Sequence, residues 1–229
     1  MSLTIQENPP KEPWPNSKCV IIAVISLIIG AAIFALAYIG MNSHTGIGTI
    51  NQPLLEWIVK HRDSQITNIF KIITSTMSPL ILIGLVVFIA LIWAIIKREI
   101  WRPFLLVIAT GLGVASSSLL KIITTNGRPP ESSMIAPFET DYSFPSSHTI
   151  GIVVFLLVFS YLICSRKPEG IRIFLLCLIS IIGIGIVAAS RLYLGYHWAT
   201  DVIASVGLGL VILAIAIFID RIVAGRADN

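Results

Sequence analysis

Charged side chains are scarce in this sequence: Asp, Glu, Lys and Arg together make up 12% of its 229 residues. An average soluble domain carries about twice that share. Hydrophobic residues account for 55% of the chain, and its mean hydropathy is +0.89. The composition therefore excludes an ordinary soluble domain and favours one compact bundle in a membrane.

Cysteine and clustered basic residues are also rare. The chain has three cysteines, Cys19, Cys164 and Cys177, and all fall in apolar runs. They show no spacing typical of a disulfide framework or a zinc site, so we expect small packing residues. The net charge of +4 comes without a long basic cluster, which argues against a nucleic-acid partner.

Six apolar stretches are long enough to cross a bilayer. Several lie near the short end of the ~17–25 residues that a spanning helix needs, so we expect the helices to include flanking residues. The stretches lack the period-two alternation of barrel strands, and helices satisfy their own backbone hydrogen bonds. The predicted fold is an all-α integral membrane bundle of six helices. The stretches run approximately from Cys19 to Gly40, Leu80 to Ile96, Pro103 to Leu120, Thr149 to Cys164, Ile173 to Ala189 and Val202 to Ile219.

The first stretch lacks the features of a cleavable signal peptide. Its apolar residues continue to Met41, well beyond the about 7–15 residues of a signal core, and the preceding residues are rich in proline and glutamate. We expect a retained span. The predicted layout is a cytoplasmic tail over residues 1–17, a membrane domain over residues 18–222 and a second cytoplasmic tail over residues 223–229.

Basic residues are distributed unevenly between alternate loops, and this asymmetry predicts the orientation. If the spans alternate, four basic segments fall on one side, which is then cytoplasmic together with both termini. The loops 41–78, 121–148 and 190–201 face outward, and we expect a bacterial inner or plasma membrane. The cytoplasmic residues are Lys11, Lys18, Lys97, Arg98, Arg102, Arg166, Lys167, Arg172, Arg221 and Arg226.

The first outward loop has apolar residues at roughly helical spacing between Leu54 and Ile73, with polar residues among them. This pattern predicts one or two short amphipathic helices. Such helices either lie on the membrane surface or pack over the neighbouring loops.

A second set of ionisable residues lies on the outward side, where membrane anchoring does not explain it. Ionisable groups at the helix ends of a bundle indicate a functional site. Three cations, two histidines and one carboxylate come from segments far apart in the sequence. They are Lys121, Arg128, Arg191, His148, His197 and Asp201.

The local patterns around these residues suggest their chemistry. FPSSHT at 144–149 is typical of a helix start, whose free N–H groups can bind an anion. His197 and Asp201 stand four residues apart, so a helix would place them on one face. The carboxylate could hold one imidazole nitrogen and leave the other free to attack.

Three cations, helix-start N–H groups and hydroxyls suit a phosphoryl group best. One histidine, oriented by Asp201, can act as the nucleophile, and the other can protonate the leaving oxygen. The sequence shows no carboxylate cluster for Mg²⁺, so we expect the cations to neutralise the phosphate charge without a metal or cofactor.

In combination, these segments resemble the three-part signature of the type 2 phosphatidic acid phosphatase (PAP2) superfamily. The matching motifs are K-x6-RP from Lys121 to Pro129, PSSH at 145–148 and SR-x5-H-x3-D at 190–201. The resemblance covers about residues 50–220. It implies the membrane branch of that family, a lipid phosphate as substrate and no metal requirement.

The resemblance also implies residue roles. His197 would form a phosphohistidine, Asp201 would be its partner and His148 the general acid. The residues that would bind the phosphoryl oxygens are Lys121, Arg128, Ser146, Ser147 and Arg191. The family usually has glycine where this chain has Ser147, and we expect serine to fit because the position lies in a first helical turn.

Other functions are compatible with parts of the pattern. A transporter could use Arg191, His197 and Asp201 as a substrate or proton path, but such groups usually lie near the midplane. A serine hydrolase could use Ser146, but it has no need of three phosphate-type cations. A lipid phosphotransferase would share every residue and differ in what attacks the phosphohistidine. Candidate lipids are a polyprenyl diphosphate, phosphatidate and phosphatidylglycerophosphate.

Overall fold

The computed structural model describes residues 14–227 of the chain, and these form helices and loops without a strand. Six helices are long and apolar enough to cross a membrane, as the sequence predicts. Each contains one predicted stretch and extends past it at one or both ends. These helices are α1 (Asn16–Ser43), α4 (Pro79–Lys97), α5 (Trp101–Thr124), α6 (Ser147–Cys164), α7 (Gly170–Tyr193) and α8 (Ala199–Ala227).

The helix α6 is the centre of the bundle. It contacts α4, α5, α7 and α8, and it is the most deeply buried of the spans. Its residues are apolar almost all round, as expected for a helix that has neighbours on every side. The other spans have apolar side chains on their outer faces, which suits a lipid environment.

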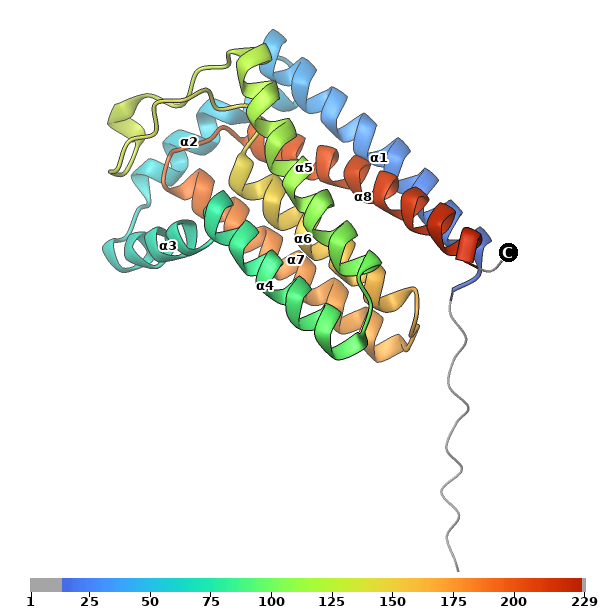
Figure 1. Cartoon of the computed structure of the whole chain (residues 1–229). Helices are drawn as coiled ribbons and strands as arrows, with labels where there is room; N and C mark the ends of the chain where they lie inside the picture. Colours follow the sequence, from blue (N-terminus) through green and yellow to red (C-terminus); the bar gives the residue numbers. More distant parts are fainter. Residues whose placement is uncertain (1–13, 228–229) are drawn as a thin grey trace, which may run out of the picture.

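The helix α1 packs along α8 at the edge of the bundle (Figure 1). The two helices meet at Gly30 and Gly207, where a Cβ on Gly30 would lie 2.6 Å from the carbonyl oxygen of Gly207. A larger residue at either position would push the helices apart. Small residues at such crossings allow the close backbone contact that stabilises helix pairs in membranes.

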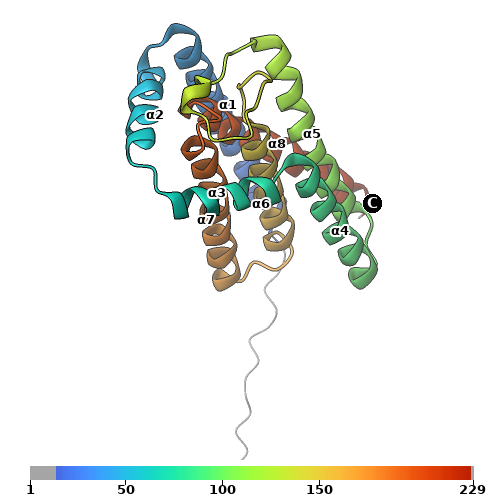
Figure 2. The same cartoon turned by 90° about the vertical axis from the view of Figure 1, so that its left-hand side faces the viewer.

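The loop 41–78 folds into short helices, as predicted. They are η1 (Gly46–Ile50), α2 (Asn51–Lys60) and α3 (Ser64–Thr76). Asp63 caps α3 by accepting hydrogen bonds from the N–H groups of Gln65 and Ile66. One side of α3 packs on α7, while Ile66, Ile69 and Ile72 are exposed. Figure 2 shows α3 lying across the end of the bundle, so it both covers other segments and presents an apolar face outward.

The opposite end of the bundle holds the start of α1 and the end of α8 (Figure 1). A buried ion pair joins α5 to α8 there: Arg102 Nη2 lies 3.1 Å from Asp220 Oδ2. The hydroxyl of Tyr161 donates to the same carboxylate at 2.7 Å. This cluster fixes the ends of three spans far from the short helices of the loop 41–78. Lys11 and the rest of residues 1–13 lie outside the described residues, and α8 continues into the predicted tail.

One expectation about the cysteines is wrong. Cys19 and Cys164 are buried, but Cys177 is exposed on the outer side of α7. It therefore faces the lipid side and does not fill the core. The error has a simple cause: a residue inside an apolar run can point to either side of a spanning helix, because lipid and protein interior are both apolar.

Candidate active site

The structure brings the predicted site residues together at the end of the bundle that carries the loops 41–78, 121–148 and 190–201. Each comes from a helix end or from the loop beside it. Lys121 lies in the last turn of α5 and Arg191 in the last turn of α7, while His148 and Asp201 lie in the first turns of α6 and α8. Helix ends therefore supply most of the site, and the bundle fixes their spacing.

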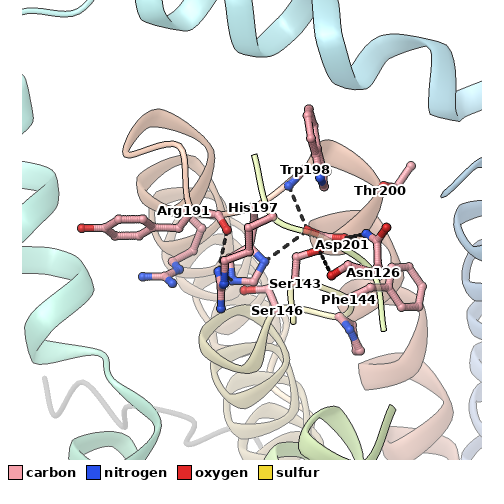
Figure 3. A network of polar contacts seen from close by, with 12 residues as sticks. Asn126, Ser143, Phe144, Ser146, Arg191, His197, Trp198, Thr200 and Asp201 are labelled. Carbon is pink, nitrogen blue, oxygen red and sulfur yellow. Dashed lines mark hydrogen bonds and ion pairs between the residues drawn. The ribbon is translucent and has the colours of Figure 1, made fainter. Parts of the chain in front are cut away.

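His197 and Asp201 pair, but by a geometry different from the predicted one. The helix α8 begins at Ala199, so His197 lies in the turn before it. Asp201 is in the first helical turn, and its Oδ2 accepts from the Trp198 N–H at 2.9 Å. The same oxygen lies 3.2 Å from His197 Nδ1, as Figure 3 shows. A helix start, rather than a shared helical face, brings the two side chains together.

The surroundings of His197 select one tautomer. Nδ1 faces the Asp201 carboxylate, which can only accept, and Nε2 lies 3.3 Å from the Nη1 donor of Arg128. Nδ1 is therefore the protonated nitrogen, and Nε2 carries the lone pair, which faces Arg128. The side chain is 2% exposed. Burial, together with the positive charges of Arg191 and Arg128, holds the pKa of His197 well below its ordinary value, so the ring is neutral at pH 7.

The turn that carries His197 depends on Gly195. This residue has φ +77°, and a Cβ on it would lie 2.2 Å from the carbonyl oxygen of Ser133. Only glycine satisfies both demands. The chain then passes through Tyr196, whose hydroxyl donates to the carbonyl of Ile135 at 2.8 Å. The chain is thus fixed on the N-terminal side of His197.

Arg191 is the most deeply buried of the three cations, with 1% exposure. It donates to the hydroxyl of Thr74 at 2.6 Å and is ion-paired with Glu139. Its guanidinium lies 4.6 Å from the centre of the Tyr196 ring, close enough for a cation–π contact. Its Nε is buried and has no hydrogen-bond partner among residues 14–227. Arg191 therefore has one unpaired donor inside the protein.

Two acidic residues that the sequence reasoning missed face the cations. Asp141 Oδ2 lies 2.5 Å from Lys121 Nζ, and its Oδ1 lies 2.5 Å from Arg128 Nη2. Glu139 Oε2 lies 2.7 Å from the same arginine. Burial raises the pKa of Asp141, but hydrogen bonds from Lys121 and Arg128 outweigh it and keep that pKa below the ordinary value. The sequence signal was available, because both acids lie in the short loop between Arg128 and His148.

Asn126 is a further residue without a predicted role. Its Nδ2 donates to Ser143 Oγ at 2.9 Å and lies 3.5 Å from Asp201 Oδ1, the carboxylate oxygen that does not face His197 (Figure 3). Trp198 closes the same turn by donating from its indole to the carbonyl of Gly127 at 2.9 Å. The loop after α5 therefore supports the carboxylate that faces His197.

Comparison with known families identifies this constellation. The family model described as the PAP2 superfamily matches residues 101–222, more than half of the chain. The chain belongs to the PAP2 superfamily. The matched residues contain all three predicted motifs, and the family assignment made from them is confirmed.

Individual PAP2 relatives agree with this assignment. Phosphatidylglycerophosphatase B of Bacillus subtilis (strain 168) is 26% identical over 119 residues, which cover 50% of this chain and 56% of the relative. The alignment thus spans about half of that protein. The crystal structure of a transmembrane PAP2 type phosphatidylglycerolphosphate phosphatase from Bacillus subtilis matches with a TM-score of 0.70 at 23% identity, covering 89% of this chain and 96% of that one. Aquifex aeolicus LpxE matches with a TM-score of 0.56 at 21% identity, covering 74% and 94%. The six-helix fold is therefore that of membrane PAP2 proteins.

The PAP2 motif with the unusual serine adopts an unstrained helix start. Ser146 is the N-cap of α6, and its Oγ accepts from the N–H of Thr149 at 3.4 Å. Ser147 is the first helical residue and does not have a positive φ. Its hydroxyl lies 2.8 Å from Ser117 Oγ on α5. Serine therefore fits here, as expected, and its side chain adds a contact between α5 and α6.

Proposed function

We propose that this protein is a membrane lipid phosphatase that works through a phosphohistidine on His197. The main support is the position of His197 Nε2, an unprotonated ring nitrogen 3.3 Å from the Arg128 guanidinium. Arg128 shares its carboxylate partners with the two other cations, Lys121 and Arg191. A nucleophile beside a three-cation anion site suits phosphoryl transfer.

The proposed reaction has two steps. The phosphoryl oxygens take the places of the Glu139 and Asp141 carboxylates on the cations. Nε2 of His197 then attacks phosphorus, the bond to the leaving oxygen breaks, and His148 gives that oxygen a proton. In the second step a water attacks phosphorus and gives a proton to His148, the bond between phosphorus and Nε2 breaks, and inorganic phosphate is released. Asp201 keeps the ring oriented and stabilises its positive charge throughout.

The position of the site supports a lipid substrate. His148, Arg191 and Thr74 line a cavity of about 360 Å³ that lies beside α3. The exposed apolar side chains of α3 suit the membrane surface, where a lipid phosphate would arrive. We propose a phosphomonoester or diphosphate of a lipid, with a polyprenyl diphosphate, phosphatidate and phosphatidylglycerophosphate as the candidates.

A release assay with the purified protein tests this proposal. Each candidate lipid is presented in detergent micelles, with and without a lipid alcohol as acceptor, and inorganic phosphate is measured. Phosphate released at the same rate in both conditions supports a phosphatase. Transfer to the acceptor in place of release would identify a phosphotransferase, and no turnover of any lipid phosphate would contradict the proposal.

We predict that the activity survives a chelator. The proposed site neutralises the phosphate with Lys121, Arg128 and Arg191, and no three potential metal ligands of the types His, Cys, Asp and Glu cluster within residues 14–227. Phosphate release in EDTA should equal release in buffer. Loss of activity in EDTA that Mg²⁺ restores would show that the cations are insufficient.

We propose that the site lies on the extracytoplasmic face of a bacterial inner or plasma membrane, because the basic loops at the other end of the bundle are expected to be cytoplasmic. In a Cys177→Ser background, an impermeant thiol reagent applied to intact cells should label Ser132→Cys and not Lys167→Cys. Both positions are exposed and lie at opposite ends of the bundle. After permeabilisation both should react, which is the control. The reverse pattern would place the site in the cytoplasm.

A further inference from the structure

The loop between α5 and α6 places a short segment, residues 136–142, directly over the three cations. We call it the acidic strap because it carries Glu139 and Asp141. Glu139 pairs with Arg128 and Arg191, and Asp141 bridges Lys121 and Arg128 with both distances at 2.5 Å. The backbone carbonyl of Asp141 also accepts from Arg128 Nε at 2.8 Å. The cations proposed to bind phosphate are therefore all paired with the strap.

The acidic strap also divides the space around the cations. Its first half, with Glu139, lines the cavity of about 360 Å³ that contains His148 and Arg191. Its second half, with Asp141, lines a separate cavity of about 440 Å³ that contains Lys121 and Ser147. A phosphoryl group bound to all three cations would have to occupy the position of the carboxylates. The strap is thus a competitor that the chain itself supplies.

The two acids differ in how firmly they are held. The side chain of Glu139 is 26% exposed and is paired with the deeply buried Arg191, whereas that of Asp141 is 60% exposed. Removing the charge of Asp141 leaves Arg128 paired with Glu139, and Lys121 is the only cation that loses its partner. Asp141 is therefore the acid that an incoming anion can displace with the least rearrangement.

We propose that Asp141 is a specificity-determining residue, which withholds Lys121 and Arg128 from singly charged phosphodiesters and yields them to doubly charged phosphoryl groups. This inference rests on the proposed phosphatase function. Exchange of one carboxylate charge for one phosphodiester charge brings no electrostatic gain. A terminal phosphate carries about −1.5 to −2 charges at pH 7 and offers three strong acceptor oxygens, so it competes well.

Selection against phosphodiesters matters because the proposed site lies at the membrane surface. A cation cluster at a bilayer surface is surrounded by phosphodiester head groups, many of them anionic. Without Asp141 these lipids would pair with the freed Lys121, compete with Glu139 for Arg128 and so block the substrate. With Asp141 in place, the ordinary lipids of the membrane are poor ligands.

The test uses Asp141→Asn, which keeps the shape of the side chain and removes its charge. Glu131→Gln is the matched control, because Glu131 is exposed in the same loop and forms no ion pair among the described residues. Two quantities are measured at pH 7.5: the inhibition of lipid phosphate hydrolysis by phosphatidylglycerol in mixed micelles, and the binding of inorganic phosphate by calorimetry. Asp141→Asn should make phosphatidylglycerol inhibit at roughly fivefold lower concentration, the effect of losing one partly exposed competing charge. The affinity for inorganic phosphate should increase by a smaller factor. Glu131→Gln should match the wild type in both measurements.

The outcomes separate the inference from the function on which it rests. Equal phosphatidylglycerol inhibition in the wild type and Asp141→Asn would overturn the role of Asp141. An equal increase in affinity for phosphatidylglycerol and for inorganic phosphate would overturn it as well. If Asp141→Asn does not fold, Asp141→Ser takes its place in the same measurements. A wild-type protein that neither releases phosphate from any lipid nor binds inorganic phosphate would contradict the phosphatase proposal itself.

Discussion

Replacing His197 by alanine should abolish turnover, with a loss of about 10³-fold or more in kcat, because the covalent route disappears with Nε2. The side chain is buried and neutral, its Nδ1 is held by Asp201, and no other group in the site has an equivalent nitrogen beside Arg128. Phosphate release from the best lipid substrate measures the loss. In the wild type, rapid acid-free quenching after labelled substrate should trap phosphate on His197.

His61→Ala is the control for this experiment. His61 is exposed in the first outward loop, where its Nδ1 contacts the Trp57 carbonyl at 2.8 Å. Its loss should leave kcat unchanged. Labelled phosphate found on Ser146, or an active His197→Ala protein, would contradict the assignment of His197 as the nucleophile. Either result would favour a serine hydrolase that uses Ser146. The structure gives Ser146 a different task, since its hydroxyl caps α6.

His148 should behave differently from His197 in the same assay. Its proposed task is to protonate the leaving oxygen, so the cost of His148→Ala should depend on the leaving group. A lipid alcohol is a poor leaving group without a proton, so hydrolysis of a lipid phosphate should show the full loss of kcat. p-Nitrophenyl phosphate has a much better leaving group and should show a small one. A loss independent of the leaving group would indicate that His148 positions the phosphate instead.

The sequence predicted the spans, and the convergence of the motif residues at one end of the bundle, because both follow from strong constraints. A spanning segment must satisfy its backbone within one helix, so an apolar run of sufficient length predicts a helix. The motif residues lie at the ends of those helices, so their common location followed once alternate loops were assigned to one side. The helix start at Ser146 and the harmless serine at position 147 followed from local rules of helix capping.

The features that sequence reasoning missed depend on the shape of irregular loops. The loop from Asn126 to Pro145 returns on itself, so Asp141 meets Lys121 across 20 positions and Asn126 reaches Asp201 across 75. No periodic pattern describes such a path. The pair of His197 and Asp201 shows the same limit. Their spacing of four residues suggested that both lie on one face of a helix, whereas His197 lies in the turn before α8 and only Asp201 is helical. The opposite charges alone could have suggested that Glu139 and Asp141, which share a loop with Arg128, would face the cations.

Replacing Asp201 by asparagine should keep the fold and reduce kcat by about 10²- to 10⁴-fold. Asp201 Oδ2 accepts from Trp198 and faces His197, while Oδ1 faces the donor group of Asn126. An asparagine places its NH₂ toward one of these sides, where it meets another donor. If the NH₂ faces His197, the ring must change tautomer and Nε2 loses its lone pair. If it faces Asn126, the tautomer survives, but the negative charge that stabilises the phosphorylated ring is gone.

Asp220→Asn is the matched control, because it makes the same chemical change on the same helix at equal burial. Asp220 is 1% exposed at the far end of α8, where it pairs with Arg102, and Asp201 is 0% exposed. Asp220→Asn removes the closer carboxylate partner of Arg102 and leaves it only the 3.9 Å contact with Glu99, so the thermal midpoint should fall, while the folded protein keeps a kcat near that of the wild type. Asp201→Asn should show the opposite pattern, a retained midpoint and a lost kcat with little change in KM. Equal loss of activity in the two variants would mean that any change to a buried carboxylate of α8 disturbs the bundle, and Asp201 would then have no special part in orienting His197.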